Sequence, residues 1–251
     1  MNEQTLKAYL SDHPWASLVR CADSTGSTNA DVKALASAGA PEGTAVIAGQ
    51  QREGRGRLGR SFFSPADSGL YLSVLLRPQR SAAELLDLTA RAAVCAQRAI
   101  KAACGIEVDL KWVNDLFLNG KKVGGILTEL TGGASPAVTL GIGINCTQTA
   151  FPPELADIAG SLAGETGLAV DRAALAAALL RQFSGIFEID WLSDYRKSCI
   201  TLGKQVRIIS AQGEKDAFAL DVTPAAALRV QYPDGSMEEI ASGEVSVRNR
   251  I

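Results

Sequence analysis

Histidine is almost absent from this sequence, and its scarcity excludes several common mechanisms. The 251-residue chain contains one histidine, His13, next to Pro14 in a predicted loop. A Ser-His-Asp or Cys-His mechanism would depend on that residue, which lies far in sequence from any nucleophile-like motif. We therefore interpret His13 as a solvated loop residue and expect chemistry that needs no imidazole.

Paired cysteines are missing as well. The five cysteines are widely spaced, and none belongs to a C-x-x-C pair: Cys21, Cys95, Cys104, Cys146 and Cys199. This pattern favours free thiols in a reducing compartment over disulfides or a zinc or redox site. The polar amino-terminal segment lacks the features of a secretory signal, and no segment approaches the length of a transmembrane helix. We therefore expect a cytoplasmic protein without a membrane partner.

Neither sign of charge is in large excess. Lys and Arg total 25 against 27 Asp and Glu, which gives a net charge of −2. This balance argues against broad electrostatic binding of DNA or anionic membranes, so any functional positive charge must be local. With 47% hydrophobic residues, the chain can bury one sizeable core and still form a small second module.

The hydrophobic pattern predicts an α+β domain followed by a small all-β module. Ser27-Thr28-Asn29 precedes a predicted capped helix, and Asn119-Gly120 predicts a tight hairpin within residues 116–130. Further strands are expected at 44–49, 70–76, 107–112 and 137–145, and helices at 82–104 and from 171 to 195. After residue 202 short alternating runs indicate a small β-barrel of about fifty residues. We place the boundary between residues 1–199 and 200–251.

The segment Arg52–Arg60 joins two of the predicted strands and contains four arginines and three glycines. Glycines let backbone N–H groups approach a ligand closely, and guanidinium groups suit phosphate or carboxylate oxygens. The segment therefore favours an anion with more than one charged group. A solvated basic loop and a nucleic-acid contact are the alternatives, and the near-neutral chain weakens the second.

Three further motifs accompany this loop. The chain has Q-x-x-G-R-G-R-x-G-R at Gln51–Arg60, K-W-x-N-D at Lys111–Asp115 and G-x-G-I-N at Gly141–Asn145, with Ser27-Thr28-Asn29 upstream. In this order the motifs resemble those of the biotin–protein ligases, and the resemblance extends from about residue 24 to the β-rich end. It implies a mixed β-sheet with helices packed on one face, followed by a small SH3-like barrel.

The resemblance also implies an activity and its site. Biotin and ATP would be substrates, Mg²⁺ would assist, and a biotin carboxyl carrier domain of a carboxylase would accept biotin on a lysine. The residues implied for biotin binding are Ser27, Thr28, Asn29, Gln51, Arg55, Gly56, Arg57 and Lys122. Those implied for the nucleotide are Arg57, Phe62, Asn114 and Asn145, and the catalytic ones are Lys122, Arg57 and Asp115. No metal ligand is assigned.

General reasoning adds the surroundings of this site. A fused ring with an N–H/C=O face needs a few polar groups in an apolar wall, which Ile126, Leu127 and Gly141 are placed to supply. Strand alternation sends one of two adjacent lysines outward, and we expect this to be Lys121. Simpler roles compete: Ser27 and Thr28 as helix caps, and Asp115 as a turn former.

Some positions depart from the family's pattern, and other functions compete. Val113 replaces a usual proline, Leu58 a common arginine and Phe62 a frequent tryptophan. Few residues precede the catalytic motifs, so we expect no helix-turn-helix and no DNA binding. The alternatives are a lipoate or octanoyl ligase, which shares the fold, and a biotin-sensing module without ligation. Dimers through a sheet edge occur in the family, which leaves a homodimer open.

Overall fold

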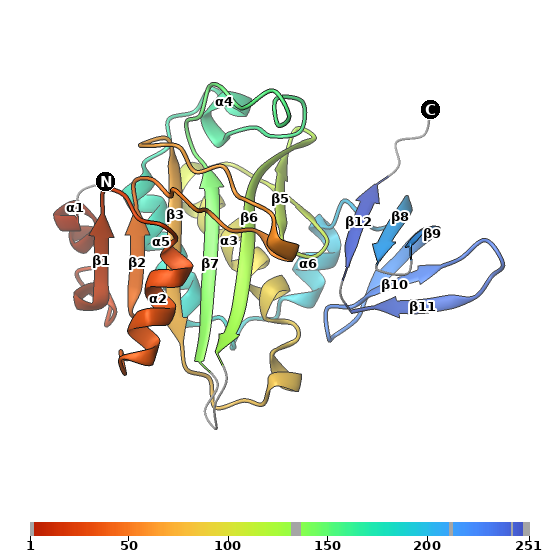
Figure 1. Cartoon of the computed structure of the whole chain (residues 1–251), viewed down its shortest axis with the longest axis horizontal. Coiled ribbons are helices and arrows are strands. Elements are labelled where there is room, and N and C mark those ends of the chain that lie inside the picture. Colours follow the sequence, from red (N-terminus) through yellow and green to blue (C-terminus); the bar gives the residue numbers. More distant parts are fainter. Residues whose placement is uncertain (1–2, 132–136, 211–212, 242, 248–251) are drawn as a thin grey trace.

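The computed structural model describes residues 3–131, 137–210, 213–241 and 243–247. The first sheet contains β1 (Val19–Ala22), β2 (Ala45–Ala48), β3 (Gly69–Leu76), β4 (Asp109–Lys111), β5 (Asp115–Leu118), β6 (Lys121–Thr131) and β7 (Ala137–Asn145). Its seven strands follow the order β1-β2-β3-β7-β6-β5-β4, with β1 and β2 parallel and the other pairs antiparallel (Figure 1). The expected mixed sheet is therefore present.

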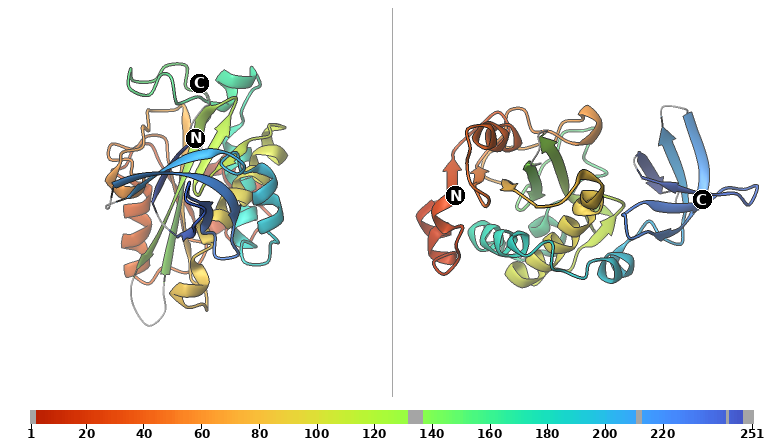
Figure 2. Two further views of the ribbon diagram at one scale, coloured as in Figure 1. Left: turned by 90° about the vertical axis from the view of Figure 1, so that its right-hand side faces the viewer. Right: turned by 90° about the horizontal axis from the view of Figure 1, so that it is seen from below.

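Helices cover this sheet unequally. They are α1 (Glu3–Tyr9), α2 (Thr28–Ser37), α3 (Leu88–Cys104), α4 (Leu162–Thr166), α5 (Arg172–Ser184) and α6 (Leu192–Ser198). Figure 2, seen from below, shows α3 and α5 on one side of the sheet and α2 on the other. Strand β3 is buried along its whole length because both faces are covered: Leu72 packs in the main core, and Leu75 packs with Val32 of α2. The α+β class is confirmed. Among the helices named above, α2 packs on the face of the sheet opposite to α3 and α5.

The hairpin between β5 and β6 has the predicted turn. Asn119 and Gly120 both have positive φ angles, 50° and 81°. This is the backbone of a tight turn whose twist matches its flanking strands. The hairpin therefore fixes which face of the sheet each of the two following lysines takes.

The predicted helix 82–104 is interrupted, so this prediction was wrong in its first turns. Ser81 and Glu84 form a capping box, with the Ser81 backbone N–H and hydroxyl each 2.8 Å from the Glu84 carboxylate. This local start gives a short 3₁₀ helix, Ala82–Leu85, and α3 begins afresh at Leu88. The end at Gly105, with φ 68°, is as predicted.

The predicted helical stretch 171–195 is also divided. Asp171 caps α5 as expected, because its Oδ1 accepts from the N–H groups of Ala173 and Ala174 at 2.8 and 3.1 Å. Helix α5 ends at Ser184, before Gly185, and α6 begins at Leu192. None of the helices in the described ranges is long and apolar enough to cross a membrane.

The carboxy-terminal module is an antiparallel sheet of five strands in the order β11-β10-β9-β8-β12. They are β8 (Gln205–Ser210), β9 (Gly213–Val222), β10 (Leu228–Gln231), β11 (Met237–Ile240) and β12 (Glu244–Val247). Trp112 links this module to the seven-stranded sheet: its buried indole N–H donates to the Ala226 carbonyl at 2.8 Å. The Trp112–Val113 peptide bond is cis. The module therefore lies against the K-W-x-N-D segment.

Candidate active site

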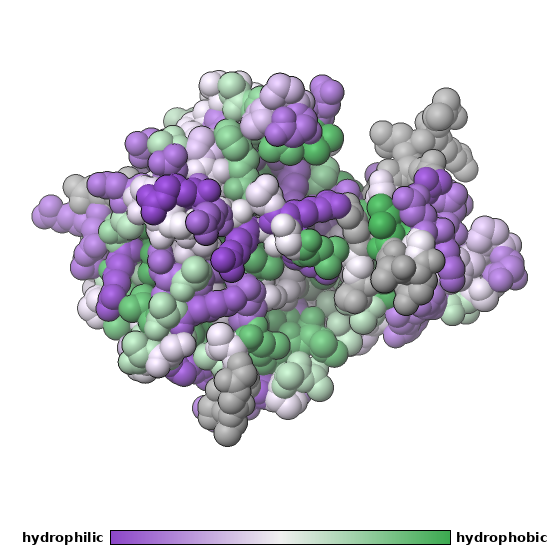
Figure 3. Space-filling view, viewed as in Figure 1, coloured by the Kyte–Doolittle hydropathy of each residue, from purple (hydrophilic) through white to green (hydrophobic). Residues whose placement is uncertain are grey.

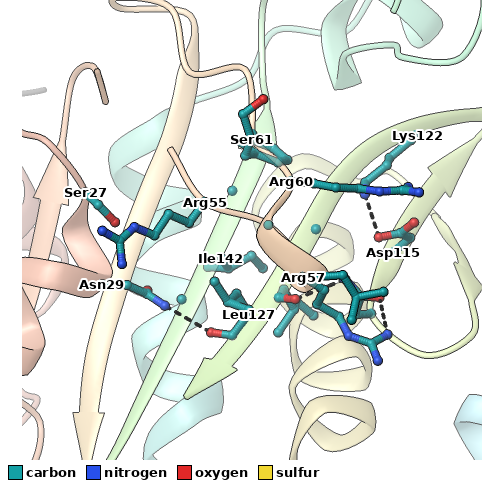
Figure 4. A pocket seen from close by; sticks show the side chains of 18 of the residues that line it. Ser27, Asn29, Arg55, Arg57, Arg60, Ser61, Asp115, Lys122, Leu127 and Ile142 are labelled. Carbon is teal, nitrogen blue, oxygen red and sulfur yellow. Dashed lines mark hydrogen bonds and ion pairs between the residues drawn. The ribbon is translucent and has the colours of Figure 1, made fainter. Parts of the chain in front are cut away.

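One pocket collects the motifs that are scattered along the sequence. It is lined by the loop Gln51–Phe62, the start of α2, the segment Lys111–Asp115 and strands β6 and β7 (Figure 4). Its volume of about 1020 Å³ includes its open mouth. On this face hydrophilic residues border a hollowed centre where apolar residues reach the surface (Figure 3). The pocket therefore joins segments that lie far apart in the sequence.

The end of the pocket at α2 presents uncharged polar groups. Gln51 Oε1 accepts from the Thr28 backbone N–H at 2.9 Å and lies 3.0 Å from Thr28 Oγ1. The Gln51 amide also donates to Ser64 Oγ at 3.0 Å, which fixes its orientation. Ser27 stands at the N-cap, yet its hydroxyl makes no cap hydrogen bond. Among the described residues Ser27 Oγ has no partner, so this hydroxyl remains available to a ligand.

A buried polar network lies behind these groups. Ser73 Oγ on β3 is 2.7 Å from Thr28 Oγ1 and 2.5 Å from Asn29 Oδ1. The Asn29 amide donates to Glu129 Oε2 at 2.7 Å and to a main-chain carbonyl at 3.3 Å, and Glu129 pairs with Lys33. Burial raises the pKa of Glu129, but the hydrogen bonds from Lys33 and Asn29 outweigh it and hold the pKa below its ordinary value. Glu129 is therefore ionised at neutral pH.

Glycines on β7 allow two side chains to lie against the sheet. A Cβ at Gly141 would stand 2.0 Å from Asn29 Oδ1, and one at Gly143 would stand 2.4 Å from the Phe62 ring. Either contact is too close for real atoms, so any larger residue at these positions would displace Asn29 or Phe62. Ile126 and Leu127 complete the expected apolar wall, together with Gly141.

The other end of the pocket carries charge. Lys122 Nζ lies 2.7 Å from Asp115 Oδ1, and Figure 4 shows the two side chains facing each other. Arg57 donates to Asn114 Oδ1 at 3.2 Å, which brings the arginine loop over the hairpin. Lys121 instead lies 3.4 Å from Glu165 and does not line the pocket, as strand alternation predicts. The hairpin lysine and the arginine loop therefore meet around one pocket.

The arginine loop owes its shape to residues with positive φ. Its 3₁₀ turn, Arg57–Gly59, contains Leu58 at φ 55° and Gly59 at φ 75°. Leu58 is 72% exposed, so its side chain adds little packing to this turn. Arg55 extends towards Ser27 and Asn29 in Figure 4. The loop thus spans both ends of the pocket while its tip stays in solvent.

Two family models match the chain. The Biotin/lipoate A/B protein ligase family matches residues 19–145, and the Biotin protein ligase C terminal domain matches residues 201–248. The chain belongs to the biotin/lipoate protein ligase family. The two matched regions correspond to the sheet that carries the pocket and to the carboxy-terminal module.

Individual relatives and solved structures agree with this assignment. The chain is 34% identical to the bifunctional ligase/repressor BirA of Bacillus spizizenii, over 90% of this chain and 72% of that protein. It is 38% identical to the biotin–[acetyl-CoA-carboxylase] ligase of Mycobacterium tuberculosis, over 73% of this chain and 71% of that protein. A biotin protein ligase from Aquifex aeolicus, solved with biotin and ATP, superposes with a TM-score of 0.80 at 29% identity. That match covers 92% of this chain and 99% of the other.

Almost every residue expected in the site of this ligase-family protein lines the pocket. Those residues are Ser27, Thr28, Asn29, Gln51, Arg55, Gly56, Arg57, Phe62, Asn114, Asp115 and Lys122. Asn145 is the exception: its buried amide donates to the Gly160 carbonyl at 2.9 Å and its oxygen accepts from Gln148 at 3.3 Å. Asn145 holds the chain that follows β7, and its expected nucleotide contact stays a prediction.

Sequence reasoning missed other parts of the site. Gly243 and Val245 bring the carboxy-terminal module to the pocket wall, and Ser73 and Glu129 lie behind its polar end. None of these four belongs to the motifs that carry the resemblance. Of these four residues, Ser73 alone carries a sequence signal. It is a polar residue in an otherwise apolar strand, the fully buried β3.

Proposed function

We propose that this chain is a biotin–protein ligase that activates biotin with ATP to biotinyl-5′-AMP and transfers the biotinyl group to a lysine of a carrier domain. The observation that carries the proposal is the division of the pocket into an end with hydroxyl and amide groups, which Arg55 borders, and an end with Lys122 and Arg57, with an apolar wall between them. Biotin has a ureido ring, an apolar body and a carboxylate, in that order. Ser27, Thr28 and Gln51 suit the ring, and Lys122 suits the carboxylate.

The first step needs no general base. The biotin carboxylate is already ionised at neutral pH, and its oxygen attacks the α-phosphorus of ATP while pyrophosphate leaves. Lys122 and Arg57 would offset charge on the transferring group and align the two reactants. Asn114 holds the Arg57 guanidinium at this end of the pocket. The scarcity of histidine is therefore no obstacle to the reaction.

The second step transfers biotin to the acceptor. The lysine amine attacks the carbonyl carbon of the mixed anhydride, the bond to the phosphate oxygen breaks, and AMP leaves. The amine must first lose a proton, because its pKa in model peptides is about 10.4. Asp115 is the residue that we assign to orient this amine, because among the side chains that the structure describes it is the one carboxylate in the pocket lining.

Mg²⁺ fits this site only together with bound ATP. The described residues hold no cluster of three or more His, Cys, Asp or Glu side chains that could bind a metal alone. Mg²⁺ at nucleotide sites is commonly held by one or two carboxylates together with phosphates. Asp115 would be the protein ligand, and the ion would neutralise charge on the phosphates.

The lipoate and octanoyl ligases remain the enzymatic alternative, because one family model covers biotin and lipoate ligases together. Incubation with ATP, a biotin carboxyl carrier domain and either [14C]biotin or labelled lipoate separates the alternatives. We expect label on the carrier lysine with biotin alone, and release of pyrophosphate. Labelling by lipoate would contradict the proposal, and biotin binding without labelling would indicate a sensing module.

Three further expectations belong to the same proposal. The acceptor is the carrier domain of a biotin-dependent carboxylase, and the reaction takes place in the cytoplasm. We divide the chain into a catalytic domain, residues 1–199, and a carboxy-terminal domain, residues 200–251. The division is supported by the family models, one of which begins at residue 201.

A further inference from the structure

The polar network behind the pocket has a defined direction. Glu129 is ionised and can only accept hydrogen bonds, and the second partner of the Asn29 amide is the Leu127 carbonyl, which also only accepts. Asn29 must therefore turn its NH₂ group towards both of them. Its Oδ1 atom is consequently fixed towards Ser73.

The direction of the hydrogen bond between Ser73 and Asn29 follows from the protons that the two groups carry. Ser73 Oγ lies 2.5 Å from Asn29 Oδ1, and an amide oxygen carries no proton, so the single Ser73 proton must lie in this contact. The 2.7 Å contact between Ser73 and Thr28 then needs the proton of the Thr28 hydroxyl. The one other described neighbour of Thr28 Oγ1 is Gln51 Oε1 at 3.0 Å, which is an acceptor too.

The Thr28 hydroxyl therefore has no proton to offer a ligand. Both of its protein neighbours accept, so its proton stays inside the protein, and its oxygen lines the pocket with lone pairs only. Every proton from Thr28 to Asn29 points towards the negative charge of Glu129. Such a chain polarises its members and makes the terminal oxygen a better acceptor.

We propose that Glu129 is a positioning residue for ligand specificity, which acts through Asn29 and Ser73 to make Thr28 an obligatory acceptor. This inference rests on the proposed function and deepens it. Ser27, whose hydroxyl has no described partner, can donate to a ligand carbonyl while Thr28 accepts from the adjacent N–H. The pair matches one C(=O)–N–H edge of a cyclic urea. Lipoyl and octanoyl groups carry no such N–H at their far end.

Selectivity between two ligands tests this role. Calorimetry would compare biotin with its cyclic carbamate analogues, in which one ureido N–H is replaced by oxygen. The wild-type chain should bind biotin at least about 100-fold more tightly than the analogue that presents an oxygen to Thr28, because a site built for an N–H rejects its absence. In Glu129→Gln the neutral amide allows the chain to reverse, so that Ser73 donates to Thr28 and Gln51 is the one described acceptor left for the Thr28 proton, which can then turn to a ligand. We expect this ratio to fall about tenfold.

Two further variants complete the experiment. Ser73→Ala removes one of the two acceptors of the Thr28 proton and leaves Gln51 as the other, so that the proton can turn to a ligand more readily and the ratio should fall here too. The test therefore does not depend on the folding of one variant. Asp87→Asn removes a comparably buried ion pair, that of Asp87 with Arg91 on α3, and should leave the ratio unchanged.

The measured affinities distinguish a failure of the role given to Glu129 from a failure of the proposed function. If Glu129→Gln and Ser73→Ala weaken the binding of biotin and of its analogue by the same factor, the network is merely structural and the inference is overturned. If the wild-type chain binds no biotin, the proposed function itself fails. A ratio that falls in both variants and holds in Asp87→Asn supports the inference.

Discussion

A methyl group at Gly141 should displace the network that orients the polar end of the pocket. In Gly141→Ala the new Cβ would lie 2.0 Å from Asn29 Oδ1 and 2.8 Å from its Cγ. Real contacts of this kind do not fall below 3.0 Å, so the side chain must move by about 1 Å. That shift breaks the hydrogen bonds of Asn29 to Ser73 and Glu129, each worth about 1 kcal/mol. We expect a loss of about 2 kcal/mol in the free energy of unfolding.

The same displacement should weaken biotin binding, because Ser73 loses its contact with Asn29 and no longer needs the Thr28 proton. We expect the dissociation constant to rise between about 5- and 30-fold, which corresponds to one or two lost hydrogen bonds of about 1 kcal/mol each. Calorimetry measures the affinity, and urea unfolding measures the stability. Gly26→Ala is the matched control, since its Cβ would meet one atom of Glu53 at 4.0 Å. An affinity within twofold of wild type in Gly141→Ala would refute the reasoning.

Three other substitutions address the charged end and the second module. Arg57→Ala should still form the adenylate but release it, and mass spectrometry of a mixture with an unrelated protein should show extra biotin on bystander lysines. No extra biotin would contradict a role of Arg57 in retaining the adenylate. Lys122→Ala should weaken biotin binding and slow activation about 100-fold, whereas Lys121→Ala should leave both unchanged. Equal effects of the two lysines on pyrophosphate release would contradict this assignment. Trp112→Phe leaves the buried Ala226 carbonyl without its donor, which should cost about 1–2 kcal/mol and raise KM for ATP while biotin affinity holds. An unchanged KM for ATP in steady-state kinetics would contradict a role of the second module at the nucleotide end of the pocket.

Local sequence signals predicted the elements that lie around the pocket. Asn119-Gly120 predicted the hairpin because two adjacent positive φ angles suit few other residues. Residues 137–145 were predicted as a strand, and β7 has these bounds. Strands β1 and β11 were not predicted: β1 is four residues long, and β11, Met237–Ile240, has three exposed residues in four. Short edge strands carry too little pattern to stand out.

Long-range contacts explain what the sequence could not predict in the site. The motifs identified the loop and the lysine, and their meeting at one pocket is confirmed. Asn29 and Glu129 are 100 positions apart, and Trp112 and Ala226 are 114 apart. A hydrogen bond across such a separation leaves no periodicity in the sequence. The polar network and the contribution of β12 therefore became visible only in three dimensions.

The tight turn at Asn119-Gly120 also constrains how this site can evolve. Neighbouring residues of a strand face opposite sides, so the number of residues in the turn decides which lysine meets the arginine loop. Inserting or deleting one residue there would exchange Lys121 for Lys122 without altering either side chain. The length of this turn is therefore constrained by the position of the catalytic lysine. We expect homologues to vary the residue types of this turn more freely than its length.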